Sequence, residues 1–197
     1  MKRVGLFGGS FDPIHLGHLI TASFVRETRN LDRIIFIPCF ISPHKTEFDY
    51  IDSIHRLEMV KIAIEGNSFF ECSDFEIKRE EVSYSIDTVK YFKTIYNEID
   101  LIIGYDNLVV FDTWKNPDEL IKLVNIIVLQ RKTPPDKNID KNRFFSLVNI
   151  IQTPIIEISS TIIRERIRNG NTVDYLVPEK VKNYIKENDL YTGRNSD

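Results

Sequence analysis

The sequence has few cysteines and no long apolar run. Cys39 and Cys72 are its 2 cysteines, and they form neither a Cys-x-x-Cys pair nor a Cys/His spacing typical of metal sites. We therefore interpret both as core thiols of a reducing compartment. No apolar run approaches the roughly 20 residues that cross a bilayer, and the N-terminus lacks the apolar segment of a signal peptide. We expect a cytoplasmic protein that is not embedded in a membrane.

An excess of charge of one sign is also missing. The 197 residues include 26 Lys and Arg against 29 Asp and Glu, a formal net charge of −3. This balance excludes a global attraction to nucleic acid or to an anionic membrane. Any phosphate binding must therefore come from a local site.

Apolar strands alternate with helical patterns along the whole chain. Strands are predicted at 4–7, 33–38, 69–72, 99–104, 125–129, 148–151 and 155–156, with a short exposed strand near 75–77. Helices are predicted at 14–29, 53–65, from Ser83 or Ser85 to 95, at 108–111, 118–123, 159–170 and 178–187. The predicted fold class is α/β, a doubly wound Rossmann-like parallel sheet with helices on both faces, in one domain over 1–197.

Ligands of such sheets lie at the carboxyl ends of the strands. The predicted loop at 39–50 follows one of these ends, and 132–143, with Pro134 and Pro135, is predicted as a surface connection.

The segment from Gly8 to His18, Gly-Gly-Ser-Phe-Asp-Pro-Ile-His-Leu-Gly-His, follows the first strand. Paired glycines let the backbone approach a ligand closely, and the next helix adds its positive end. Three positions apart, His15 and His18 share a helix face, which Gly17 leaves unobstructed. A tight turn with unrelated histidines is the plainer alternative, and metal ligation lacks a third ligand nearby. Since neither the P-loop lysine pattern nor a full GxGxxG is present, a kinase or dehydrogenase is disfavoured.

A second segment, Ile158-Ser-Ser-Thr-Ile-Ile-Arg164, opens a late helix with three hydroxyls and a guanidinium. Helix-start hydroxyls and N–H groups bind phosphate oxygens, and an arginine adds bidentate charge. Taken by itself, this segment is better interpreted as a well-capped helix with a surface arginine.

Three further features follow predicted strand ends or begin a helix. Trp114 is the only tryptophan, and its polar neighbours favour a ligand-stacking role over a core role. Asp106 could accept from a ribose hydroxyl or the adenine, or cap the helix after it. The helix start at Ser85 to Thr88 offers N–H donors for a carboxylate.

Together, GGSFDPIHLGH near the start and ISSTIIR near the end resemble the HxGH nucleotidyltransferase superfamily, which is related to class I aminoacyl-tRNA synthetases. Pro43-His-Lys45, Ser83-Tyr-Ser-Ile-Asp-Thr88 and Gly104-Tyr-Asp106 followed by Trp114 are similar to the bacterial nicotinate-mononucleotide adenylyltransferases. Two positions depart from that pattern. Ser10 replaces a frequent threonine but keeps the hydroxyl, and Tyr105 replaces a small residue, which alters the pocket floor unless the ring turns outward.

The resemblance implies transfer of AMP from ATP to nicotinate mononucleotide, which gives nicotinate adenine dinucleotide and pyrophosphate in NAD biosynthesis. It implies catalytic roles for His15, His18, Lys45 and Arg164. ATP contacts are expected from Gly8, Gly9, Ser10, Phe11, Gly104, Asp106, Ile158, Ser160 and Thr161, and contacts to the nicotinate nucleotide from Tyr84, Thr88, Trp114 and Lys115. Mg²⁺ is expected with ATP, bound through phosphate oxygens and water rather than by a protein metal site.

Two alternatives stay open at this point. A phosphopantetheine adenylyltransferase would use the same phosphate loops with another acceptor pocket, and a non-catalytic sensor of the same fold would bind ATP without turnover. Arg131 is a weaker phosphate candidate, and His55 is interpreted as structural because its helix shows no polar company. A homo-oligomer is compatible with the sequence.

Overall fold

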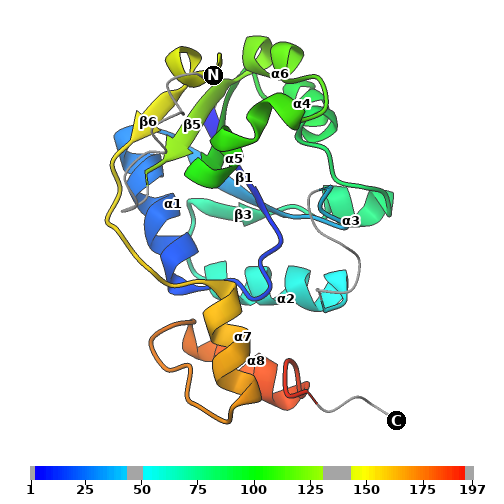
Figure 1. Cartoon of the computed structure of the whole chain (residues 1–197), viewed down its shortest axis with the longest axis vertical. Helices are drawn as coiled ribbons and strands as arrows, with labels where there is room; N and C mark the ends of the chain where they lie inside the picture. Colours follow the sequence, from blue (N-terminus) through cyan, green and yellow to red (C-terminus); the bar gives the residue numbers. More distant parts are fainter. Residues whose placement is uncertain (1–2, 44–50, 131–142, 194–197) are drawn as a thin grey trace.

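The computed structural model describes residues 3–43, 51–130 and 143–193 (Figure 1). Its strands are β1 (Arg3–Gly9), β2 (Arg33–Pro38), β3 (Phe70–Cys72), β4 (Glu98–Gly104), β5 (Asn125–Leu129) and β6 (Asn149–Ile151). Its helices are α1 (Leu16–Thr28), α2 (Ser53–Ile64), α3 (Phe75–Arg79), α4 (Ser85–Lys93), α5 (Tyr105–Val109), α6 (Pro117–Leu123), α7 (Ser160–Arg168) and α8 (Glu179–Glu187), with 3₁₀ turns η2 (Phe111–Thr113) and η4 (Phe145–Leu147). Lys45, Arg131 and nearly all of the predicted 132–143 connection lie outside the described residues.

The six strands form one sheet in the order β3-β2-β1-β4-β5-β6, and every neighbouring pair is parallel. Phe7 of β1 is paired with Phe36 on one side and Ile102 on the other. The chain runs outward from β1 toward β3, then returns to β4 on the other side of β1. This reversal creates a crevice at the carboxyl ends of β1 and β4, and the predicted fold class is confirmed.

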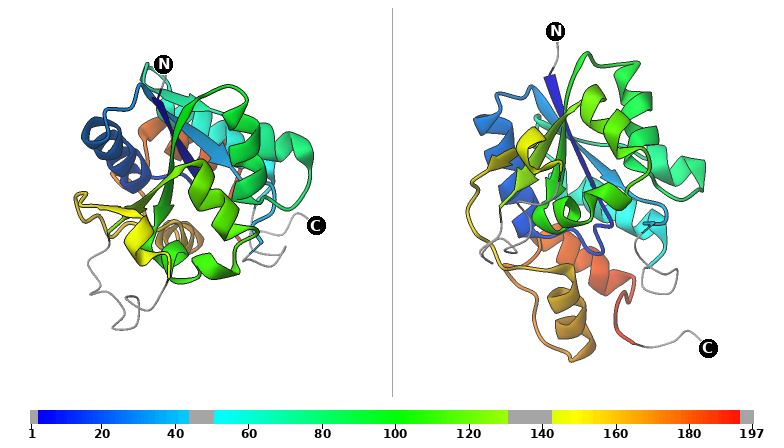
Figure 2. Two further views of the ribbon diagram at one scale, coloured as in Figure 1. Left: turned by 90° about the horizontal axis from the view of Figure 1, so that it is seen from above. Right: turned by 45° about the horizontal axis from the view of Figure 1, so that its top comes forward.

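Alternating side chains of the strands build two cores on opposite faces of the sheet. Phe7, Phe36 and Ile102 pack with α1, α2, α7 and α8, whereas Leu6, Leu101 and Val128 pack with α4, α5, η2 and α6. Figures 1 and 2 show these helical layers on the two sides of the sheet, with α7 and α8 beyond α2. Both faces are thereby removed from water, which explains the continuous apolar runs of the strands.

A buried carboxylate ties the amino ends of the strands together. Asp100 of β4 is fully buried and accepts hydrogen bonds from Arg29 Nε at 2.7 Å, from Arg3 Nη2 at 3.1 Å and from Asn125 Nδ2 at 2.9 Å. Three donors compensate the desolvation of one carboxylate. This cluster lies at the end of the sheet opposite the crevice, so its role is structural.

Three predictions about local structure are wrong. Residues 75–77 belong to helix α3, because Glu76 and Ile77 are both buried and a half-exposed strand would bury only one of two neighbours. Residues 155–156 are not a strand, and Ile155 is 56% exposed beyond the sheet edge. Neither Ser83 nor Ser85 caps α4. Tyr84 occupies the N-cap, and Ser83 Oγ instead accepts from Phe40 N–H at 3.0 Å.

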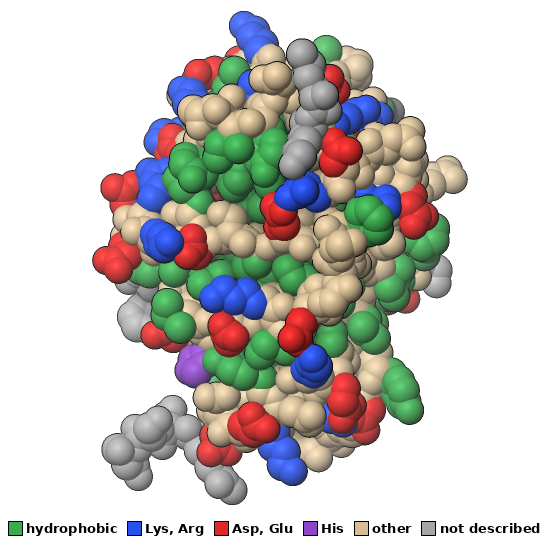
Figure 3. All heavy atoms as spheres, turned by 180° about the vertical axis from the view of Figure 1, so that it is seen from behind, with side chains coloured by type: hydrophobic (Ala, Val, Ile, Leu, Met, Phe, Trp, Pro, Cys, Tyr) green, Lys and Arg blue, Asp and Glu red, His purple; other side chains and the backbone are tan. Residues whose placement is uncertain are grey.

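The helices predicted at 159–170 and 178–187 correspond to α7 and α8, with boundaries that agree within two residues. Ser159 caps α7 by accepting from Ile162 N–H at 3.2 Å, and Gly170 follows that helix with φ of +68°. Pro178 precedes α8. Over the described ranges, no helix combines the length and apolarity needed to cross a membrane. The face in Figure 3 carries Lys and Arg interspersed with Asp and Glu rather than a patch of one sign.

Candidate active site

An open cavity of about 750 Å³ lies in the crevice at the carboxyl ends of β1 and β4. Of the residues predicted for the site, it is lined by Gly8, Gly9, Ser10, Phe11, His15, His18, Tyr84, Gly104, Asp106, Trp114, Lys115, Ile158, Ser160, Thr161 and Arg164. Thr88 does not line it, and Lys45 lies outside the described residues. The structure thus brings together segments from both ends of the chain.

The glycine turn after β1 leaves room for a ligand. A Cβ on Gly8 would meet no atom within 4 Å, so the cavity reaches the backbone there, whereas a Cβ on Gly9 would lie 3.1 Å from the Phe11 ring. Phe11 is buried in the core with φ of +48°. A left-handed conformation is costly for an aromatic residue and persists where the surroundings enforce it, as at ligand loops.

The two histidines lie together at the start of α1. Their ring centroids are 3.6 Å apart with planes inclined by 24°. His15 N–H donates to His18 Nδ1 at 3.3 Å, so a neutral His18 carries its proton on Nε2. Burial lowers the pKa of His15 to about 4, which makes it a neutral imidazole at pH 7. A Cβ on Gly17 would lie 3.0 Å from His15 Nδ1, which explains the glycine between them.

Helix α7 is joined directly to the loop between β1 and α1. Ser160 Oγ donates to the Pro13 carbonyl at 2.9 Å, and Arg164 Nη1 donates to the Asp12 carbonyl at 2.8 Å. Arg164 Nη2 also lies 3.4 Å from Thr161 Oγ1. The two motifs that the sequence separates by some 140 residues are therefore one structural unit.

A buried arginine that the sequence analysis missed holds the same loop from α2. Arg56 is 1% exposed and donates to the carbonyls of Ser10 at 2.8 Å and Phe40 at 3.0 Å. It thereby joins the loop after β1 to the loop after β2. The sequence did contain a signal for this role, because Arg56 directly precedes Leu57 on the buried side of α2. A charged residue in such a position needs a specific partner.

The opposite side of the cavity is aromatic. Trp114 packs against Phe111 at a centroid distance of 5.0 Å. Lys115 Nζ lies 4.6 Å from the centre of the Tyr84 ring and donates to Asp87 at 3.0 Å. Tyr105 packs against the core beneath α4, α5 and α6. Aromatic faces attract cations.

Thr88 is buried behind the aromatic side of the cavity and does not line it. Its N–H donates to the Tyr84 carbonyl at 3.3 Å within α4, and its hydroxyl donates to Glu76 Oε1 at 2.5 Å. Burial raises the pKa of Glu76, and hydrogen bonds from Thr88 and Ser83 oppose that rise. Ser85, the first residue of α4, does line the cavity, and first-turn N–H groups have no carbonyl one turn earlier.

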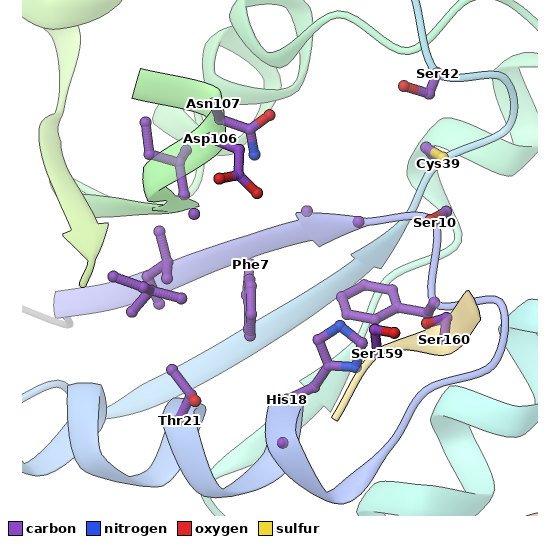
Figure 4. A pocket seen from close by; sticks show the side chains of 18 of the residues that line it. Phe7, Ser10, His18, Thr21, Cys39, Ser42, Asp106, Asn107, Ser159 and Ser160 are labelled. Carbon is purple, nitrogen blue, oxygen red and sulfur yellow. The ribbon is translucent and has the colours of Figure 1, made fainter. Parts of the chain in front are cut away.

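Polar residues outside both motifs also line the cavity and were missed: Thr21, Ser42, Glu76, Asn107, Thr113, Gln130 and Thr153. Figure 4 shows Asp106 and Asn107 on α5 across the end of β1 from His18 on α1. Asn107 directly follows Asp106 after β4, so its position at a strand end was a usable signal.

The structure also bears on the predictions for His55 and for metal binding. His55 has polar company after all, because its Nδ1 lies 2.9 Å from the Tyr184 hydroxyl of α8. In the part of the chain that the structure describes, no group of three or more His, Cys, Asp or Glu side chains is arranged to hold a metal ion.

Comparisons with known proteins agree on one family. The cytidylyltransferase-like family model matches residues 6–166. The nicotinate-nucleotide adenylyltransferase of Bacillus subtilis is 42% identical over 193 residues, which cover 97% of this chain and 99% of that protein. A probable nicotinate-nucleotide adenylyltransferase of Caldicellulosiruptor bescii is 42% identical over 194 residues, covering 96% and 98% of the two chains.

Solved structures share the fold. Plasmodium falciparum nicotinic acid mononucleotide adenylyltransferase complexed with NaAD superposes with a TM-score of 0.80 at 22% identity, over 97% of this chain and 98% of the other. A putative nicotinate-nucleotide adenylyltransferase from Vibrio parahaemolyticus gives 0.67 at 20% identity, over 98% and 97%.

Proposed function

The chain belongs to the cytidylyltransferase-like family and, within it, to the nicotinate-nucleotide adenylyltransferases, and we propose that it makes nicotinate adenine dinucleotide from ATP and nicotinate mononucleotide. An oxygen of the 5′-phosphate of nicotinate mononucleotide attacks the α-phosphorus of ATP. The bond from that phosphorus to the oxygen shared with the β-phosphate breaks, and pyrophosphate leaves. This conversion belongs to NAD biosynthesis.

Positioning and charge stabilisation suffice for this transfer, because no covalent intermediate on the protein is needed. We assign the ATP phosphates to the space beside Gly8, where the backbone lies open to the cavity. There His18 donates from Nε2, Arg164 offsets negative charge, and Thr161 contributes a hydroxyl at the start of α7. Ser160 lines the same space, but its hydroxyl donates to the Pro13 carbonyl, so its contribution to ATP binding is to hold the loop. Lys45 is assigned a further positive charge by resemblance alone.

We assign the nicotinate ring to the aromatic side of the cavity, which is formed by Trp114 and Tyr84. A pyridinium ring stacked on Trp114 gains a cation–π interaction, and the carboxylate is directed to N–H donors at the start of α4. We assign this donor to Ser85 rather than Thr88, because Thr88 N–H already donates to the Tyr84 carbonyl within the helix. Tyr84 and Lys115 complete this side of the cavity.

ATP is expected to enter as its Mg²⁺ complex. Since the described residues offer no cluster of three acidic, histidine or cysteine ligands, the ion would be held mainly by phosphate oxygens and water. Asp106 and Asn107 follow the end of β4 and line the cavity across the end of β1 from His18 (Figure 4). We place the adenosine beside them. Cys39 and Cys72 are thiols that form no disulfide, which favours a cytoplasmic enzyme, and a homo-oligomer is compatible with this proposal.

The observation that carries the proposal is the direct bonding of α7 to the loop after β1, through Ser160 and Arg164, around the mouth of one cavity. The test is pyrophosphate release from ATP with nicotinate mononucleotide, nicotinamide mononucleotide or phosphopantetheine as acceptor. Release should be fastest with nicotinate mononucleotide. Turnover of phosphopantetheine alone would reassign the acceptor, and tight ATP binding without turnover would indicate a sensor.

A further inference from the structure

The C-terminal segment reaches into the loop between β1 and α1. Tyr191 lies beyond α8, is 9% exposed, and its hydroxyl donates to Asp12 Oδ1 at 2.7 Å. Asp12 is 1% exposed and lies two residues after Ser10. A hydrogen bond to a buried carboxylate is stronger than one between neutral groups, and its loss leaves the acceptor unsatisfied.

Backbone conformation on both sides of this contact is unusual. Tyr191 has φ of +65°, and Phe11, the neighbour of Asp12, has φ of +48°. Both are aromatic residues in the left-handed region, where a side chain is disfavoured. Such conformations persist only where surrounding contacts enforce them, and they concentrate at functional loops. The protein therefore holds the backbone at both ends of the Tyr191–Asp12 hydrogen bond in a defined conformation.

Asp12 also faces the arginines that border the site. Arg164 Nη1 lies 3.6 Å from Asp12 Oδ2 and donates to the Asp12 carbonyl, while Arg56 donates to the Ser10 carbonyl. Burial raises the pKa of Asp12, and the Tyr191 hydrogen bond and the charges of Arg164 and Arg56 oppose that rise. Burial and the Asp12 carboxylate both raise the pKa of Tyr191, so its hydroxyl remains a donor.

We propose that Tyr191 is a positioning residue for the adenylyl transfer: its hydroxyl fixes the Asp12 carboxylate, which in turn holds Arg164 and the loop from Ser10 to His18 in the geometry that receives the ATP phosphates. This inference rests on the proposed function for its link to ATP. The C-terminal segment thus acts on the reaction through Asp12 without touching the substrate. Neither the glycine–histidine motif nor the serine–arginine motif includes Tyr191.

The test replaces Tyr191 by phenylalanine, which removes the hydroxyl and keeps the ring. Tyr184→Phe is the matched control, because Tyr184 also belongs to the C-terminal region but contacts His55 instead of the loop. Three quantities are measured on the full chain: kcat and KM for ATP from pH 5 to 9, amide hydrogen exchange of residues 9–18, and the midpoint of thermal unfolding.

Tyr191→Phe should lower kcat/KM for ATP about ten-fold, as loss of a hydrogen bond to a charged group predicts. The acid limb of its activity should move to higher pH, because Asp12 loses a donor that lowers its pKa while Arg164 and Arg56 stay in place. Exchange in residues 9–18 should quicken. Tyr184→Phe should change none of these. Tyr191→Phe should also unfold at a lower temperature than the wild type, because it leaves a buried carboxylate oxygen without its donor.

Asp12→Asn provides a second arm. If Tyr191 acts through Asp12, adding Tyr191→Phe to Asp12→Asn should have little further effect on kcat/KM. Equal behaviour of Tyr191→Phe and Tyr184→Phe, or full additivity with Asp12→Asn, would overturn the inference. Failure of the wild-type chain to release pyrophosphate would refute the proposed function instead, and the exchange measurement would still decide whether Tyr191 orders the loop.

Discussion

The imidazole rings of His15 and His18 are stacked with centroids 3.6 Å apart, and His15 N–H donates to His18 Nδ1. Two imidazolium ions at this separation would repel each other strongly. Burial avoids the conflict by lowering the pKa of His15 to about 4, so His15 stays neutral at pH 7. His18 lines the cavity and accepts from His15 N–H at Nδ1, so Nε2 is the atom that we assign as the donor to the ATP phosphates.

His18→Ala should therefore lower kcat by about 100-fold or more, the typical loss when one donor to a developing charge is removed. ATP affinity should fall much less, because the donor matters most in the transition state. Steady-state kinetics and calorimetric titration of ATP would measure the two effects. His55→Ala, which alters a histidine bonded to Tyr184 on α8, is the control. Equal losses in kcat and affinity would make His18 a ground-state binding group.

The lowered pKa of His15 predicts how stability depends on pH. The unfolded chain takes up a proton on this residue near the ordinary pKa of 6.5, whereas the folded chain resists it until about pH 4. The free energy of unfolding should therefore fall as pH drops from 6.5 to 4, by up to about 3 kcal/mol from this residue. Above pH 6.5 the residue should make no difference to the pH dependence.

Urea denaturation of the wild type and His15→Gln at several pH values isolates this contribution. The difference between the two free energies should change between pH 6.5 and 4 and stay constant above pH 7. A difference that is flat throughout would show that His15 ionises in the folded protein as it does in the unfolded one.

Gly8→Ala should weaken ATP binding with little loss of stability. The added Cβ would meet no protein atom within 4 Å and would project into the space assigned to the phosphates. Gly5→Ala is the matched contrast on the same strand. Its Cβ would lie 2.6 Å from Ile34 Cδ1, so overpacking should cost about 1–3 kcal/mol of stability. Unfolding curves and ATP titrations distinguish the two, and unchanged ATP affinity in Gly8→Ala would remove the phosphates from this position.

Trp114→Ala should raise KM for nicotinate mononucleotide about ten-fold, as loss of a cation–π contact of 1–2 kcal/mol predicts. KM for ATP should change little, because Trp114 lies on the aromatic side of the cavity. Trp114→Phe should recover part of the loss. Initial-rate kinetics with each substrate varied in turn would measure these effects. A parallel rise in both KM values would indicate instead that the substitution distorts the whole cavity.

The sheet and most of its helices were predictable from the sequence, because continuous apolar runs such as 125–129 match β5 at both ends. Short segments were less predictable. The apolar alternation at 75–77 fits one helical turn as well as a strand, and only the burial of Glu76 distinguishes them. Ser83 was misjudged as a cap because its real partner, Phe40, is remote in sequence.

The site was predictable where function requires a local pattern, as in the glycine turn and the paired histidines. The residues that support it were not. Arg56, Glu76 and Tyr191 act through partners on other elements, at sequence separations of 46, 12 and 179 residues. Such contacts form only when the sheet and the C-terminal helices have packed together. They therefore cannot be predicted from a local sequence pattern.

A crystal structure of the chain with bound nicotinate adenine dinucleotide would test the central claim most directly. The pyridine ring should lie on Trp114 with its carboxylate near Ser85 N–H, and the phosphates should lie beside Gly8 within hydrogen-bond distance of His18. A dinucleotide bound with its phosphates away from the end of β1, or with the pyridine ring remote from Trp114, would contradict the account.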